Sequence, residues 1–137
     1  MAEEQEAVSE RRKRQRFVAK RRGEYCFWVV MDERRLPLQD LSLEGFGVAG
    51  HDGLDLGYRF SFVLQRLGVP DEIRGTARVV NRVQTMTGEL TGVLFEALEG
   101  DGASRIGDWL TAHVLATASV PISEKEASRI VSGPSLI

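Results

Sequence analysis

Polar and apolar residues alternate with a period of two along much of the chain, which is the pattern of half-buried β-strands. The clearest example is residues 58–65, where Tyr58, Phe60, Phe62 and Leu64 alternate with more polar neighbours. The aromatic and β-branched run at residues 25–31 also favours a strand. The predicted strands cover residues 25–31, 36–39, 46–49, 58–65, 73–83 and 89–98.

These six short strands follow one another at spacings near ten residues, which is typical of an antiparallel barrel or sandwich. Asp32 to Arg35 is expected to be a turn, and Pro37 places residues 36–39 at a sheet edge because proline cannot donate to a ladder. The segment between Asp40 and Gly45 is expected to be a polar loop.

A helical period replaces the alternation after Gly102. Ile106, Trp109, Leu110, His113 and Val114 fall at i, i+3, i+4, i+7 and i+8, which predicts a helix over about residues 103–116, docked through Trp109. His113 lies on its apolar face and is expected to be a satisfied core or rim histidine. A capping-box pattern that begins at Ser123 predicts a short second helix to Val131.

Composition narrows the class of protein. The chain has 137 residues and a formal net charge of −2, which fits one domain without a broad basic face. Cys26 is the single cysteine, and we expect it to be a buried thiol in a reducing compartment. The first residues do not form a signal peptide, and no apolar run approaches the roughly 20 residues of a membrane helix. We therefore expect a soluble, cytoplasmic protein with no membrane insertion.

No set of catalytic or metal-ligating residues stands out in the sequence. His51 and His113 are far apart, and one cysteine provides no metal-ligand spacing. The glycines around Phe46 lack the spacing of a phosphate-binding loop. The sequence thus predicts neither an enzyme nor a metal site, and no cofactor.

The densest charge in the chain lies near its start. Residues 11–22 contain eight Lys or Arg and no acid. Such a run stays in water or meets an anion, since burying unpaired charges is costly. Arg12 and Arg16 stand at i and i+4 with Arg11 beside them, and arginine can bind an oxyanion or a guanine edge bidentately. The alternative is a solvated basic leader.

A second motif, Asp40-x-Ser42-x-x-Gly45, follows the first predicted strands. A carboxylate can accept two hydrogen bonds from the N1 and N2 donors of a guanine. The Ser42 hydroxyl can add another or brace the loop, and Gly45 allows a positive φ and close approach of a ligand. The alternative is an ordinary Asx-type turn.

In this order, on this strand pattern, the two motifs resemble those of the PilZ domain family over roughly residues 11–116. Arg12-x-x-x-Arg16 and Asp40-x-Ser42-x-x-Gly45 carry the resemblance. It implies a mainly β protein: a six-stranded antiparallel β-barrel with a C-terminal α-helix packed on it. It also implies binding of the bacterial second messenger cyclic di-GMP.

Carried over by position, the resemblance implies that the arginines hold guanine and phosphate. Asp40 and Ser42 would contact a guanine edge, and Gly45 would let the loop close on the ligand. Asn81 and Arg82 fall near a strand position where a further stacking or polar contact is common. The implied ligand-binding residues are Arg11, Arg12, Arg16, Asp40, Ser42, Gly45, Asn81 and Arg82.

The sequence therefore predicts three regions: an N-terminal tail at 1–10, a PilZ-like barrel with leader and helix at 11–118, and a C-terminal extension at 119–137. The expected function is a cyclic di-GMP receptor or effector that orders its leader on binding and signals to a protein partner, with a ligand-dependent dimer left open. No specific DNA or RNA partner is expected. Two alternatives remain: non-specific binding of nucleic acid or an anionic surface through the leader, and a degenerate barrel that binds only protein.

Overall fold

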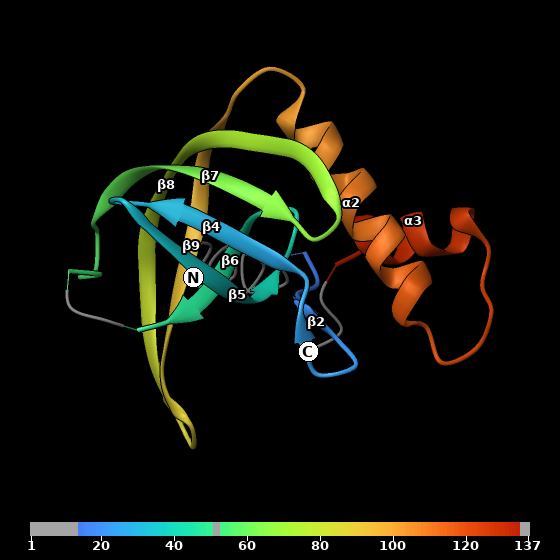
Figure 1. Ribbon diagram of the computed structural model, residues 1–137, viewed down its shortest axis with the longest axis horizontal. Helices are drawn as coiled ribbons and strands as arrows, with labels where there is room; N and C mark the ends of the chain where they lie inside the picture. Colours follow the sequence, from blue (N-terminus) through green and yellow to red (C-terminus); the bar gives the residue numbers. More distant parts are fainter. Residues whose placement is uncertain (1–13, 51–52, 135–137) are drawn as a thin grey trace, which may run out of the picture.

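The computed structural model describes residues 14–50 and 53–134, which form a β-barrel with two helices beside it (Figure 1). Three short strands come first: β1 (Phe17–Val18), β2 (Lys20–Arg21) and β3 (Glu24–Tyr25). The barrel strands are β4 (Phe27–Met31), β5 (Arg34–Leu41), β6 (Gly45–Ala49), β7 (Arg59–Arg66), β8 (Val69–Thr85) and β9 (Gly88–Leu98). The helices are α2 (Gly102–Thr117) and α3 (Glu124–Ser132).

Six of these strands close into an antiparallel barrel. They follow the order β5-β4-β7-β8-β9-β6, and β6 pairs back onto β5. The predicted six-stranded antiparallel barrel with a C-terminal helix is therefore confirmed. The sandwich alternative is wrong, because the β5–β6 ladder joins the two ends of the main sheet, so that its six barrel strands form one closed sheet and not two packed sheets.

Alternation along the strands builds the core. In β7, Phe60, Phe62 and Leu64 are buried while Arg59 and Ser61 are exposed. The Phe62 ring belongs to a cluster with Phe46 and Phe95. Its centroid lies 5.9 Å from that of Phe46 and 5.4 Å from that of Phe95, and the latter two lie 5.9 Å apart. The expected strand at residues 58–65 therefore has the predicted inward face.

Helix α2 covers one end of the barrel through the predicted apolar face. The Trp109 ring stacks on Phe27 at a centroid distance of 6.1 Å. His113 packs its ring edge against Phe27 at 5.2 Å, and its Nε2 lies 2.8 Å from the carbonyl oxygen of Val18. His113 is thus a satisfied core histidine, as expected, and it ties β1 to the helix.

Strand β5 corrects three sequence expectations. It begins at Arg34, so the turn before it contains only Asp32 and Glu33. Pro37 does not mark a sheet edge: it lies opposite Trp28 of β4, just before the stretch that pairs with β6. Asp40 lies in the strand and not in a loop. Barrel closure gives β5 neighbours on both sides, which the local sequence could not indicate.

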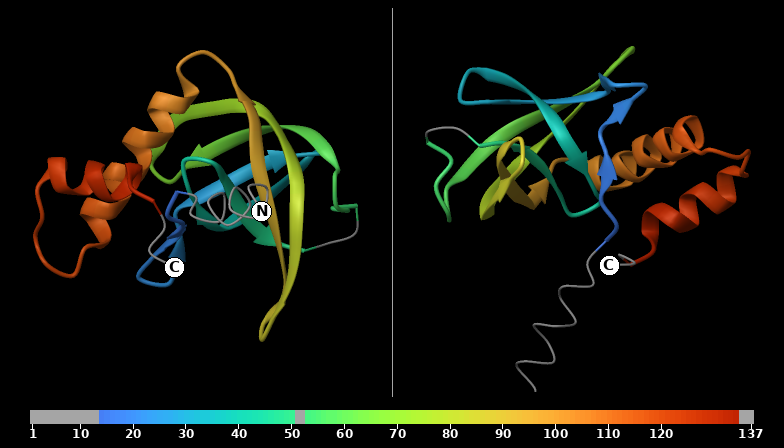
Figure 2. Two further views of the ribbon diagram at one scale, coloured as in Figure 1. Left: turned by 180° about the vertical axis from the view of Figure 1, so that it is seen from behind. Right: turned by 90° about the horizontal axis from the view of Figure 1, so that it is seen from below.

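The chain ends are joined beside the barrel. The capping box of α3 is present, with Ser123 and Glu126 each accepting a backbone N–H of the other residue. Arg14 forms an isolated antiparallel bridge with Pro134, and its guanidinium donates to the Ser132 carbonyl oxygen. Figure 2 shows β1 (blue) and α3 (red) approaching each other there, and the β8–β9 hairpin (yellow) projecting beyond the barrel.

Candidate functional site

The leader and the Asp40 motif meet on the outside of the barrel. Strand β1 pairs antiparallel with the end of β5, so that Val18 lies opposite Asp40. This pairing brings Arg16, just before β1, beside the same residue. A guanidinium nitrogen of Arg16 lies 3.3 Å from Oδ1 of Asp40, across a sequence separation of 24 residues. The β1–β5 ladder thus brings together Arg16 and Asp40, which are distant in the chain.

Asp40 is held in a partly desolvated position. Its side chain is 18% exposed, and this burial raises the pKa of the carboxyl above its ordinary value. The Arg16 guanidinium and the backbone N–H of Gly47 act in the opposite direction, but the pKa remains raised. A carboxylate in this setting gains from any further hydrogen-bond donor that approaches it.

Two glycines form a floor beside this carboxylate. Asp40 pairs with Gly47, Gly47 with Gly92, and Gly92 with Asn81, so the four residues make one row across β5, β6, β9 and β8. A Cβ on Gly47 would lie 2.9 Å from Oδ2 of Asp40, and one on Gly92 would lie 2.3 Å from Oδ1 of Asn81. The row therefore presents two polar side chains lying over bare backbone.

A groove of about 650 Å³ adjoins the row, and Asp40 lines it. We call it the Asp40 groove. Lys20 and Tyr25 of the β2–β3 hairpin form one wall, and Thr85 to Leu90 of the β8–β9 hairpin form another. The Lys20 ammonium lies 4.6 Å from the centre of the Tyr25 ring. The volume of the Asp40 groove is within the roughly 300–1,000 Å³ of small-molecule sites. Its lining includes an aromatic ring, a cation and a carboxylate.

Ser42 and Gly45 shape the turn that follows Asp40. Ser42 is buried; its hydroxyl accepts from the Glu44 N–H at 3.1 Å and donates to the Gly45 carbonyl oxygen at 3.4 Å. A Cβ on Gly45 would lie 1.9 Å from the backbone oxygen of Val93. Both residues therefore act within the fold: the hydroxyl braces the turn, and the glycine permits close approach of β6 to β9.

Asn81 and Arg82 separate in the structure. Asn81 belongs to the Asp40 row, whereas the next residue leaves the opposite face of β8 because strand side chains alternate. Arg82 donates to Oε1 of Glu89 at 2.6 Å and lies 3.5 Å from Asp55. Asn81 thus lies in the row with Asp40, whereas Arg82 lies outside the row and contacts Glu89, a residue of the groove wall.

Some of the residues expected from the sequence lie outside the described part of the chain, and several residues around Asp40 were not predicted. Arg11 and Arg12 lie outside the described residues, as does His51. The missed residues are Lys20, Tyr25, Gln39, Gly47 and Gly92. Only the close spacing of Gly45 and Gly47 hinted at a bare backbone, since the rest depends on strand register.

Two solved structures are similar to this chain in fold. The Bacillus subtilis inhibitor of motility MotI/DgrA, a PilZ-domain protein, matches with a TM-score of 0.60 and 18% sequence identity, covering 77% of this chain and 51% of that one. The chain has a PilZ-like fold. It spans about half the length of MotI/DgrA. The PilZ domain of YcgR from Escherichia coli, solved with c-di-GMP, has a TM-score of 0.44 at 18% identity, with 88% of each chain covered.

No protein-family model matches the sequence, and no curated protein matches it. Within residues 14–50 and 53–134, no cluster of three or more His, Cys, Asp or Glu is placed to hold a metal ion. In the same part of the chain, neither helix of the PilZ-like domain has the length and apolar character needed to cross a membrane.

Replacing Gly45 by alanine tests its role in the barrel. We expect Gly45→Ala to lower the unfolding free energy by about 3 kcal/mol, because the new methyl group would overlap the backbone of β9. Gly107→Ala is the control: its nearest neighbour is Leu43 Cδ2 at 3.9 Å, and alanine in a helix should add about 0.5–1 kcal/mol. Urea unfolding measures both. An undiminished stability of Gly45→Ala would contradict this role.

The raised pKa of Asp40 predicts a specific dependence of stability on pH. The native state binds this proton more readily than the unfolded chain, so ionised Asp40 lowers stability above its folded pKa. Asp40→Asn should therefore be more stable than the unmodified chain at neutral pH. The difference should shrink as pH falls through the folded pKa toward the unfolded value near 3.9.

Asp71→Asn is the control of opposite sign for that experiment. The side-chain hydrogen bond from Arg105 lowers the pKa of Asp71, so this variant should be less stable at neutral pH and lose the difference on acidification. Urea unfolding across a pH series measures both differences. A stability deficit of Asp40→Asn that grows with rising pH would show that the ion pair with Arg16 outweighs burial.

Proposed function

We propose that this PilZ-like domain is a cyclic di-GMP receptor, with Arg16 and Asp40 as its central ligand contacts. The observation that carries the proposal is the 3.3 Å contact between these two side chains, beside a row of bare glycine backbone. Asp40 would accept hydrogen bonds from a guanine edge, and Arg16 would turn from the carboxylate to a phosphate or a purine face. The role we propose is binding, not catalysis.

The other residues expected from the sequence differ in the roles we propose for them: some contact the ligand, and others act indirectly. Asn81, at the far end of the row, would add a polar contact, and Arg11 and Arg12 would close over the ligand from the leader. Ser42 and Gly45 would act indirectly, by holding the turn that presents Asp40. Arg82 has its own carboxylate partners and is not assigned a contact.

The energetics agree with binding of moderate strength. Charge-assisted hydrogen bonds contribute roughly 1.5–3 kcal/mol each, whereas fixing a mobile residue costs about 1–2 kcal/mol. Residues 17–18 are already fixed by their ladder with β5, so this part of the cost does not recur on binding. An affinity of about micromolar, roughly −8 kcal/mol, is the expected result.

Isothermal titration with cyclic di-GMP tests the proposal. Arg16→Ala and Asp40→Ala should each weaken binding by about 10- to 100-fold, which corresponds to the loss of one charge-assisted contact. Arg74→Ala is the matched control, because it breaks another surface ion pair, 3.1 Å from Glu72 on β8, and should leave affinity unchanged. No heat with the folded protein, at concentrations well above micromolar, would reject the proposal.

The same titration at low and high salt separates the alternatives. Non-specific binding through the basic leader should fall steeply with salt and ignore Asp40→Ala. Specific binding should depend on both motif residues at either salt concentration. A flat titration at both concentrations would favour a barrel that binds only a protein partner.

A bound ligand would be sensed near Arg14. Arg14 lies two residues before Arg16; its backbone N–H donates to Glu44 at 3.0 Å, and its guanidinium donates to the carbonyl of Ser132 at the end of α3. We propose that fixing the leader on the ligand also fixes α3. The surface formed by the leader and α3 would then be the one a partner protein, or a second copy of the chain, contacts.

Hydrogen exchange measured with and without cyclic di-GMP checks this output. Amides at residues 14–21 and 124–132 should become more protected together when the ligand binds, because Arg14 joins the two segments. In Arg14→Ala the change at 124–132 should be lost while that at 14–21 persists. Protection confined to the leader in the unmodified chain would show that α3 does not take part.

A further inference from the structure

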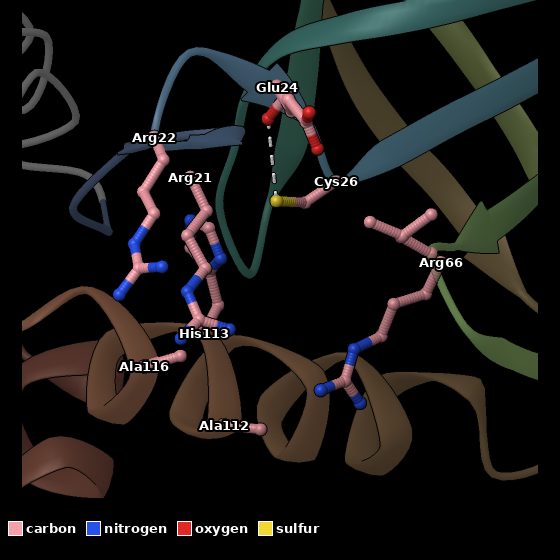
Figure 3. A pocket seen from close by; sticks show the side chains of 9 residues that line it. Arg21, Arg22, Glu24, Cys26, Arg66, Ala112, His113 and Ala116 are labelled. Carbon is pink, nitrogen blue, oxygen red and sulfur yellow. Dashed lines mark hydrogen bonds between the residues drawn. The ribbon is translucent and has the colours of Figure 1, made fainter.

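A second pocket lies on the other side of the β2–β3 hairpin, between that hairpin, the end of β7 and helix α2 (Figure 3). Its volume is about 460 Å³. We call it the arginine pocket. It is lined by Arg21, Arg22, Glu24, Cys26, Arg66, Leu67, Ala112, His113 and Ala116.

Three arginines surround this pocket without a carboxylate partner. Figure 3 shows Arg21 and Arg22 extending from the hairpin toward α2, and Arg66 extending toward the same helix from the opposite side. Within the described part of the chain, none of the three has a carboxylate at ion-pair distance. Glu24 is the one acid among the residues that line the pocket, and no ion pair joins it to these three arginines.

Arg22 lies in a tight turn at the edge of the pocket. It occupies the two-residue turn between β2 and β3 with φ 55°, followed by Gly23 with φ 80°. Turns with two positive φ values favour Asn or Gly, because other side chains are strained there. Arginine is not a residue that this turn geometry favours, and its side chain lines the arginine pocket.

The remaining lining decides the kind of anion. Leu67, Ala112 and Ala116 give the pocket an apolar side, and Cys26 adds a thiol whose pKa is raised by burial. A neutral thiol adds no competing negative charge. Three cations against one carboxylate leave an excess of two positive charges, which matches a phosphate group carrying about −1.5 to −2 charges. The arginine fork suits its oxygens.

We propose that the arginine pocket binds the phosphate group of a small phosphorylated molecule, separately from the Asp40 groove. Alternation along the hairpin divides its residues between the two sites. Lys20 and Tyr25, which pair across it, line the Asp40 groove, whereas Arg21 and Glu24, the next pair, line the arginine pocket. One hairpin is thus the common wall of both sites.

Titration calorimetry with inorganic phosphate and with pyrophosphate, in magnesium-free buffer at constant ionic strength, tests the proposal. Arg22→Asn and Arg66→Gln should each weaken binding by about tenfold. Arg22→Asn is informative because asparagine suits the turn, so its melting temperature should not fall. Lys125→Ala, which removes an exposed cation on α3, is the control and should bind as the unmodified chain does.

Two further experiments distinguish the arginine pocket from the Asp40 groove and a free phosphate from a lipid headgroup. Asp40→Ala should keep pyrophosphate binding even if it loses cyclic di-GMP binding, so the two sites can fail independently. Vesicles of phosphatidic acid in phosphatidylcholine test a lipid headgroup as the source of the phosphate, and binding to vesicles without binding of free pyrophosphate would overturn the proposal. It would also be overturned by no heat with either anion, or by binding that Arg22→Asn and Arg66→Gln leave unchanged.

Discussion

Strand β5 pairs with three other strands, and the positions of Arg16 and Asp40 follow from this arrangement. Its first half pairs with β4, its second half with β6, and β1 extends the ladder beside its last residues. The β5–β6 ladder closes the barrel, and the β1–β5 ladder holds the leader against it. The β1–β5 ladder is what places Arg16 beside Asp40, because 24 residues separate the two in the chain.

Burial of the Asp40 carboxyl lowers the stability of the folded chain when this group is ionised. Because its pKa is raised, ionising this carboxyl costs more free energy in the folded chain than in water. A ligand that donates hydrogen bonds to the carboxylate would offset this cost. Gly47 and Gly92 make room for the row: both are buried, and the side chains of Asp40 and Asn81 occupy the space that a Cβ would need. A partly buried carboxylate with a raised pKa is a local cost of the kind expected where a protein binds a ligand.

The β2–β3 hairpin and α2 connect the two sides of the molecule. The hairpin has the Asp40 groove on one face and the arginine pocket on the other. His113 of α2 lines the arginine pocket and also contacts the carbonyl of Val18, whose strand neighbour is Asp40. The hairpin therefore separates the two pockets, and His113 connects the arginine pocket to the strand beside Asp40.

Local pattern determined much of this protein. Alternation specified the inward face of β7, the helical period specified Trp109 and His113 on the buried side of α2, and Ser123 specified the start of α3. These features depend on residues within one or two turns of each other, which a sequence displays directly.

The tertiary structure alone decided closure of the barrel, the strand character of Asp40, and which polar residues share a face. Asn81 joins Asp40 through Gly92 and Gly47 and Arg82 does not, because a strand turns consecutive side chains to opposite faces and the register between distant strands selects the row. Register arises from non-local pairing, so the sequence could name the site's two motifs but not the floor and walls between them.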